Sequence, residues 1–170
     1  KKLILISMKQ FNIFFGIFLA LALSRFIPHP PNFTSLIALS FYVPALFGRK
    51  YMFAVILSFA ITDLIIGYHS GTFFTWGSVI LIGLLSNLFA RTLISRMSGA
   101  LVGAIIFFIV TNFGVWVSGM YGYTFDGLLK CFYLAIPFFA YSLISTIVFS
   151  FTIEMIYRIY QFKTLDQRYK

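Results

Sequence analysis

The chain has 170 residues, of which 61% are hydrophobic, 21% aromatic and only 10% charged, and its mean hydropathy is +0.96. A soluble domain of this size has too little interior to bury so much apolar surface, so the composition excludes a soluble fold and indicates an integral membrane protein. The formal net charge of +9 does not indicate nucleic-acid binding, because the basic residues stand in ones and twos and form no patch.

Apolar runs, most of them close to the roughly 20 residues that a membrane-spanning helix needs, recur along the whole chain. They predict an all-α fold, a single membrane domain over residues 1–170 with six transmembrane helices. The expected spans are residues 10–27, 34–47, 51–67, 73–91, 99–118 and 129–157. The second is short and contains Pro44, which predicts a tilted, broken or partly re-entrant span. The sixth is long enough to continue beyond the membrane as an amphipathic end.

The basic residues give the orientation. With six spans, one side of the membrane receives 11 of the 13 Lys and Arg residues, and the other receives only Arg25 and Lys130. Because Lys and Arg collect on the cytoplasmic side, both termini are predicted to be cytoplasmic, with the cell membrane as the location. The first span, with Ala20–Ala22, also resembles a signal peptide, but its apolar run is long for one.

Between the first two spans stands the stretch RFIPHPPNFT, Arg25 to Thr34. Its three prolines fix φ and disfavour helix in the residues before them, which predicts a stiff, extended connection. Such a connection holds His29 and Asn32 at fixed positions, and Asn32 or Thr34 is expected to cap the second helix.

The third span contains Asp63, about one turn inside its outer end. A carboxylate at that depth requires a partner or a wet cavity, because it costs on the order of 2–3 kcal/mol on insertion scales. Arg25 lies at the corresponding depth of the first span and is the expected partner. The pair either pins two helices or faces a ligand, and the sequence does not separate these roles.

Both histidines, His29 and His69, fall in predicted outer loops. Imidazole is a good ligand for a metal, a haem or a corrin cobalt, but two histidines forty residues apart show no metal-site spacing. Hydrogen bonding at the membrane surface is the simpler interpretation, and we expect no metal site. Cys131 is the only cysteine, so the chain can form no internal disulfide.

In the fifth span, Asn112 and Trp116 are four residues apart and share one helix face near its outer end. An amide inside the membrane needs a hydrogen-bond partner, and a tryptophan beside it can stack on a planar ligand. Trp116 also fits the aromatic belt found at every bilayer surface. Near the inner end of the sixth span, Glu154 and Arg158 are predicted to form an i,i+4 pair.

The combination of RFIPHPPNFT, TDLIIGYHS, TNFGVW and AIPFF (Ala135 to Phe139) resembles a family of small uncharacterised bacterial membrane proteins over roughly residues 20–145. In its six-span size and polar outer face that family is similar to the S components of energy-coupling factor vitamin transporters. The resemblance implies an S-component-like bundle that captures a vitamin-like micronutrient and releases it inward by toppling. It also implies a coupling subunit with ATPases as partner, although some S components act alone.

We therefore expect a transport protein, not an enzyme, that binds a small-molecule substrate in an outward-facing pocket. The expected substrate-binding residues are Arg25, His29, Asn32, Asp63, His69, Asn112 and Trp116. The alternative is an accessory or assembly subunit of a larger membrane complex. An integral membrane enzyme ranks last, because no nucleophile stands beside a base. No phosphate-binding GxxxxGK[ST] stretch occurs, so ATP-driven work needs a partner.

Overall fold

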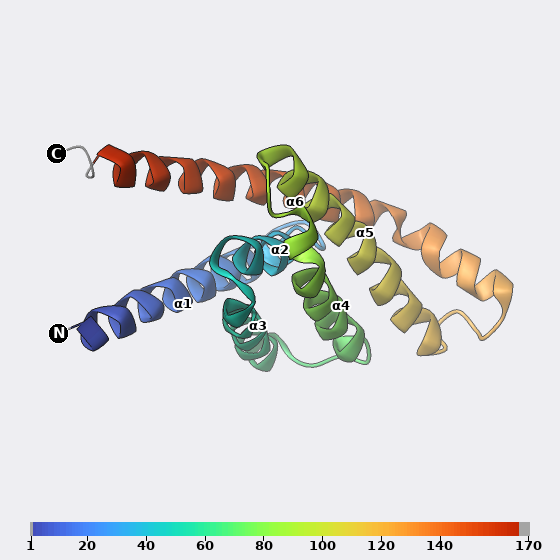
Figure 1. Ribbon diagram of the computed structural model, residues 1–170. Coiled ribbons are helices and arrows are strands. Elements are labelled where there is room, and N and C mark those ends of the chain that lie inside the picture. The colour runs from blue at the N-terminus through green and yellow to red at the C-terminus, as the bar shows by residue number, and fades with distance from the viewer. Residues whose placement is uncertain (1, 167–170) are drawn as a thin grey trace.

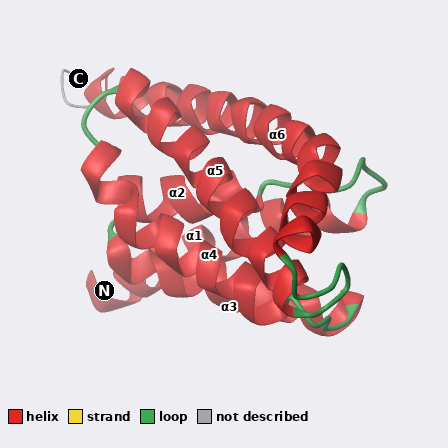
Figure 2. Ribbon diagram, turned by 90° about the vertical axis from the view of Figure 1, so that its right-hand side faces the viewer, coloured by secondary structure: helices red, strands yellow, loops and turns green. Residues whose placement is uncertain are grey.

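The structure, a computed structural model, describes the backbone of residues 2–166 and the side chains of residues 11–162. The described part consists of helices and their connections (Figure 2). In chain order the elements are α1 (Lys2–Phe26), α2 (Leu36–Phe47), the 3-10 helix η1 (Arg49–Tyr51), α3 (Met52–Ile66), α4 (Thr72–Leu85), the 3-10 helix η2 (Ser86–Phe89), α5 (Leu93–Val117) and α6 (Phe125–Asp166). The all-α prediction and its six principal helices are confirmed.

The first residues of α1 and the last residues of α6 lie at the same end of the molecule (Figure 1), which we call the terminal end. Figure 1 shows the 118–124 connection at the end opposite the termini and the 67–71 connection at the lower edge of the view, between α3 and α4. Together with 27–35, these are the loops that the sequence places on the outer face. Six of the basic residues used for orientation, Lys1, Lys2, Lys9, Lys163, Arg168 and Lys170, have side chains outside the described residues.

Among the described residues, three helical stretches are long and apolar enough to cross a membrane: Thr72–Phe89, Leu93–Val117 and Phe125–Phe162. Two shorter apolar helices accompany them, Phe11–Phe26 and Leu36–Phe47. Large apolar side chains cover the outside of these helices, as expected for surfaces that face lipid. The chain is thus a multi-pass membrane protein.

The helix α2 occupies the centre of the bundle. It contacts all five other α-helices, and its residues from Leu36 to Pro44 are all buried. With 12 residues and a rise of about 1.5 Å per residue it is about 18 Å long, well short of a bilayer core of about 30 Å. The second expected span, 34–47, is therefore a core helix that does not reach across alone. Hydropathy missed this because a protein interior and a lipid environment select the same apolar residues.

Most helix boundaries differ from the expected spans because caps, and not hydropathy, decide where a helix ends. In α5 the Thr92 hydroxyl accepts the Ser95 N–H at 3.1 Å, so the helix begins at Leu93, six residues before the predicted start. Gly48 and Gly67, at φ 97° and 107°, end α2 and α3. The helix α6 runs for 42 residues without a break at Pro137.

Close contact between α2 and α5 depends on Gly99. A Cβ atom at this position would lie 2.6 Å from the Phe41 ring and 2.5 Å from Phe89, which real side chains do not tolerate. Gly16 on α1 is different, because a Cβ there would meet nothing within 4 Å, so that glycine is not needed for packing within the chain.

Candidate ligand-binding cavity

A buried ion pair joins α1 to α3 at the end of the bundle opposite the termini. Arg25 Nη2 lies 2.7 Å from Asp63 Oδ1, as the sequence predicted. The second carboxylate oxygen accepts a hydrogen bond from the indole N–H of Trp76 on α4, at 2.7 Å. Each oxygen of the Asp63 carboxylate therefore has a charge-assisted hydrogen bond, one from Arg25 and one from Trp76. Side chains of α1, α3 and α4 meet at this carboxylate.

Other contacts hold the guanidinium of Arg25 in place. Its Nη1 donates to the Thr62 hydroxyl and to the Phe59 carbonyl, the latter at 3.5 Å. Its plane also lies over the Phe59 ring, 4.7 Å from the ring centre. The charge of Arg25 is thus neutralised by Asp63 and its orientation is fixed before any ligand arrives.

The sequence interpretation missed Trp76. An aromatic residue near the start of a membrane helix is usually assigned to the interfacial belt. A usable signal was present, because α3 and α4 form an antiparallel pair across a short connection, 67–71. Asp63 is four residues before that connection and Trp76 five residues after it, so the two side chains share one level.

Beside this ion pair lies a cavity of about 300 Å³. It is lined by Arg25, His29, Asn32, Thr34, Leu36, Ile37, Phe59, Ile66, His69, Thr75 and Phe107. Four of the seven predicted site residues are among them, and Asp63 stands directly behind Arg25. The wall thus draws on α1, α2, α3, α4 and α5 and on two loops far apart in the sequence.

The two histidines face the cavity with opposite hydrogen-bonding character. The carbonyl of Pro30 can only accept, so His29 Nδ1, 2.7 Å away, carries a proton. The N–H of Gly71 can only donate, so His69 Nδ1, 3.1 Å away, is unprotonated. With neutral rings, Nε2 of His29 is then an acceptor and Nε2 of His69 a donor. The cavity therefore offers one imidazole acceptor and one imidazole donor.

Asn32 occupies a tight turn, with φ 62°. The Phe33 N–H bonds to the Pro30 carbonyl at 3.0 Å, so the chain folds back here and the predicted extended connection is wrong. Asn tolerates this left-handed conformation better than most residues, which explains its presence. Ser35 holds the N-cap position of α2 and makes no side-chain cap bond, but the Thr34 hydroxyl accepts the N–H of Leu36, the first residue of α2, at 3.4 Å, so the capping expected of Thr34 is found in this weaker form.

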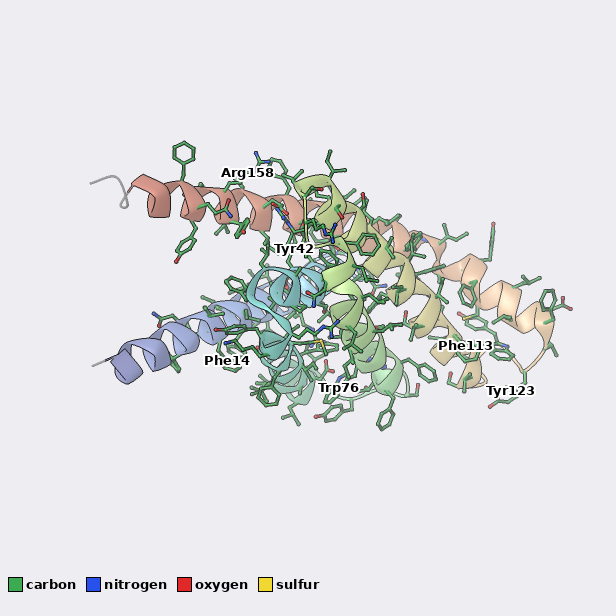
Figure 3. The ribbon with its side chains drawn as sticks, in the orientation of Figure 1. Phe14, Tyr42, Trp76, Phe113, Tyr123 and Arg158 are labelled. Carbon is green, nitrogen blue, oxygen red and sulfur yellow. The ribbon has the colours of Figure 1, made fainter. Side chains whose placement is uncertain are left out.

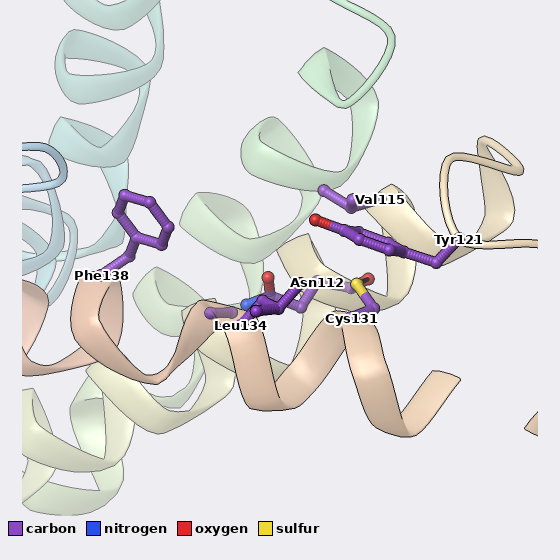
Figure 4. Close-up of a pocket in the computed structure, with 7 residues that line it drawn as sticks. Asn112, Val115, Tyr121, Cys131, Leu134 and Phe138 are labelled. Atoms are coloured by element: carbon purple, nitrogen blue, oxygen red, sulfur yellow. Dashed lines mark hydrogen bonds between the residues drawn. The ribbon is translucent and has the colours of Figure 1, made fainter. Parts of the chain in front are cut away.

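Asn112 lies elsewhere, on a second cavity of about 190 Å³ between α5 and α6. Its side-chain amide donates to the Phe108 backbone carbonyl at 2.7 Å. The backbone carbonyl of Asn112 accepts from Cys131 Sγ at 3.3 Å. Figure 4 shows the Tyr121 ring lying over Asn112 and Cys131. Trp116 lines neither cavity and donates to the Thr124 carbonyl at 3.3 Å. The structure does not bring these two residues to the histidines.

A match to a family model shows to which family this chain belongs. The chain belongs to a family of unknown function, DUF6580, whose model matches residues 6–167. The match includes every residue that lines either cavity, and it confirms the expected membership of an uncharacterised family. A comparison with curated proteins found no match, and neither did one with solved structures.

A second buried ion pair in this DUF6580 chain corrects the predicted Glu154–Arg158 pair. Arg96 on α5 binds both carboxylate oxygens of Glu154 on α6, with Nε–Oε1 at 2.5 Å and Nη2–Oε2 at 2.7 Å. Arg158 is exposed on α6 (Figure 3). The local i,i+4 spacing suggested the wrong partner, because the true partner is 58 residues away.

From the sequence, Arg96 was expected in the loop between the fourth and fifth spans, as one of the basic residues that indicate the orientation. It lies inside α5 and is only 8% exposed, with a further bond from Nη1 to the Ala90 carbonyl at 3.2 Å. Within the described residues, no group of three or more His, Cys, Asp or Glu side chains could hold a metal ion.

Proposed function

We propose that this protein is a six-helix inner-membrane transport protein that captures a small polar molecule in the cavity beside Arg25. The observation that carries the proposal is the convergence of Arg25, His29, Asn32 and His69 on one cavity. These four side chains come from α1 and from two loops far apart in the sequence, and packing alone does not require the loop residues to share one space. A volume of about 300 Å³ is at the lower end of ligand pockets, which favours a ligand of modest size.

The chemistry of the wall supports a molecule with both hydrogen-bond donors and acceptors. His29 offers an acceptor, His69 a donor, and the Asn32 amide both. The aromatic side chains of Phe59 and Phe107 supply an apolar surface for the rest of the ligand. Because Asp63 neutralises Arg25, the cavity carries no unpaired charge, and this argues against the anionic group first considered for Arg25.

Transport is favoured over a purely structural role by the position of the cavity. The wall combines the start of α2, a helix too short to cross the bilayer alone, with the exposed loop residues His29, Asn32 and His69, so a solute can reach the space between the helices from that end. The resemblance to S components supports the same class, with both termini cytoplasmic, the cavity facing outward, and a coupling subunit with ATPases as a possible partner.

The test is native mass spectrometry of the protein gently extracted from the membranes of its own host, followed by identification of any released small molecule. We expect a bound molecule in the unaltered protein and its loss in the His69→Ala and Asn32→Gly variants. Glycine is chosen at position 32 because it accepts φ 62° without strain while removing the amide. Asn87→Ala, an exposed amide in η2, is the matched control and should retain the molecule.

Retention of the same molecule in all three variants would place binding elsewhere and overturn the proposal. A preparation that carries no small molecule but a stoichiometric set of other polypeptides would favour the alternative, an assembly subunit.

A further inference from the structure

One face of α6 carries a run of buried hydroxyl groups and a carboxylate. Ser142, Ser145, Thr146, Ser150 and Glu154 are all at most 2% exposed. The last three are spaced by four residues, so they form one row, and each step of the row is about 6 Å. Apolar residues would serve simple packing in this position equally well, so the polar row requires an explanation.

Three hydroxyl groups in this region have no hydrogen-bond partner within the part of the chain that the structure describes: Tyr42 Oη on α2, and Thr146 Oγ1 and Ser150 Oγ on α6. Serine and threonine in membrane helices usually donate to a carbonyl one turn back, as Ser142 does to Phe138 at 3.1 Å. Thr146 and Ser150 do not. Buried hydroxyls without partners are rare, and ordered water is their usual partner.

The Tyr42 phenol of α2 faces Ser150 and Glu154 of α6 across the contact between these two helices, and Thr146 is one helical turn before Ser150 in the same row. The Tyr42 phenol lies next to the Ser150 hydroxyl and the Glu154 carboxylate without a well-formed hydrogen bond to either. Figure 3 shows Tyr42 in this central position. We call Tyr42, Thr146, Ser150 and Glu154 the α2–α6 seam.

The seam runs from behind the cavity wall, which α6 itself does not line, to the Arg96–Glu154 pair. At its start, Ser145 Oγ lies 3.5 Å from the carbonyl oxygen of Asn32, a residue of the cavity wall. At its other end, the guanidinium of Arg96 binds both oxygens of Glu154 and ties α6 to α5. This end is toward the terminal end of the bundle, where α5 begins.

We propose that the α2–α6 seam is the hydrated route by which a small uncharged polar solute leaves the cavity, and that the Arg96–Glu154 pair closes its far end. The inference rests on the proposed function, because it supplies the exit for the captured molecule. Its walls are hydroxyl groups, and its single carboxylate is neutralised by Arg96. An ion would find no countercharge there, whereas water and an uncharged polar solute would find donors and acceptors. This route differs from release by toppling of the whole protein.

The test is thiol accessibility of the full-length protein in membrane vesicles, probed with a small, charged, membrane-impermeant methanethiosulfonate. The Ser150→Cys variant is made in a Cys131→Ser background, which removes the only native thiol. Val148→Cys, at a position 45% exposed on the apolar outside of α6, is the matched control. The charged reagent requires water at the thiol, so only a hydrated position should react.

We expect the Ser150→Cys variant to react, and to react about tenfold faster or more when Glu154→Gln is added, while the Val148→Cys variant stays inert with or without it. Arg96→Lys keeps the charge but loses the two-pronged contact, and should give an intermediate rate without unfolding the protein. Because the readout needs no ligand, it fails or succeeds separately from the mass-spectrometric test of capture.

Two results would overturn the route. Inert Ser150→Cys variants in all three backgrounds would mean that the seam is dry and closed. Equal reactivity at positions 148 and 150 after Glu154→Gln would mean that the ion pair only holds the bundle together.

Discussion

Replacing Asp63 with Asn is the sharpest test of the ion pair beside the cavity, because the two side chains have nearly the same shape. The substitution removes the charge that neutralises Arg25 and turns one carboxylate oxygen into an N–H₂ group. That group would face either the guanidinium of Arg25 or the indole N–H of Trp76, both of which only donate. One of the two 2.7 Å contacts is therefore lost whichever way the amide turns.

The expected loss follows from burial. The side chains of Arg25 and Asp63 are only 15% and 7% exposed, so solvent screens the pair little. Removing one member of a buried pair costs roughly 3–5 kcal/mol, because the remaining charge is left without a partner. For a protein of this size, 1 kcal/mol changes the melting temperature by about 2–4 °C, so we expect a decrease of about 6–20 °C.

The assay is thermal unfolding of the detergent-solubilised protein at a fixed scan rate, with Trp76→Phe as the graded comparison. Phenylalanine keeps a ring near Phe59, whose centre lies 6.3 Å from that of Trp76, but removes the N–H that Asp63 accepts. This variant should lose about 1.5–3 kcal/mol, less than Asp63→Asn. A double variant, Arg25→Leu with Asp63→Leu, should recover part of the loss, because it leaves no unpaired charge.

An Asp63→Asn melting temperature within 2 °C of the unaltered protein would refute the reasoning, since it would mean that Arg25 finds water when the carboxylate is lost. A double variant less stable than either single variant would also contradict it, because the pair would then contribute shape rather than charge.

At the other buried pair, Glu154→Gln should lower the free energy of unfolding by about 3–5 kcal/mol, as Asp63→Asn does. Arg158→Gln should change the melting temperature by less than about 2 °C. The reverse order would restore the local pair that the sequence suggested. In the packing between α2 and α5, Gly99→Ala should destabilise by about 1–3 kcal/mol because its methyl group meets the Phe41 ring. Gly16→Ala, in open surroundings on α1, should be neutral or stabilise by up to about 1 kcal/mol through helix propensity. Both pairs are compared by the same thermal scan, and equal effects of the two alanine substitutions would contradict the assigned contact.

The sequence predicted the parts of the site that depend on depth in the membrane. Arg25 and Asp63 were paired because two opposite charges at one level of two neighbouring spans have no better partner, and the structure confirms the contact. His29, Asn32 and His69 were grouped because alternating spans bring their loops to the same side, and all three line one cavity. Topology and hydropathy contain this information directly.

Depth in the membrane does not show which side of a helix a residue faces, and therefore which neighbouring helix it contacts. Asn112 has the right depth for the main cavity, but it belongs to the α5–α6 contact and lines a separate one. Hydropathy is equally blind to which apolar helix is central, because Leu and Phe suit lipid and protein alike. That is why α2 was expected to be a tilted, broken or re-entrant span and not the central helix, and why Arg96 was assigned to the surface although its partner Glu154 lies on another helix.

The two buried ion pairs tie together different parts of the bundle, and this difference gives them different roles. Arg25, Asp63 and Trp76 join α1, α3 and α4, whereas Arg96 and Glu154 join α5 to α6. Between the two groups stands α2, whose Tyr42 phenol lies next to Ser150 and Glu154 of α6. Opening the second pair would therefore remove a polar tie between α5 and α6, which remain packed through Phe108 against Phe132 and Phe139, without disturbing the helices that carry most of the cavity wall. A solute could then leave along the α2–α6 seam while Arg25 and His69 remain in place, so the same cavity would be ready to bind again when the pair closes.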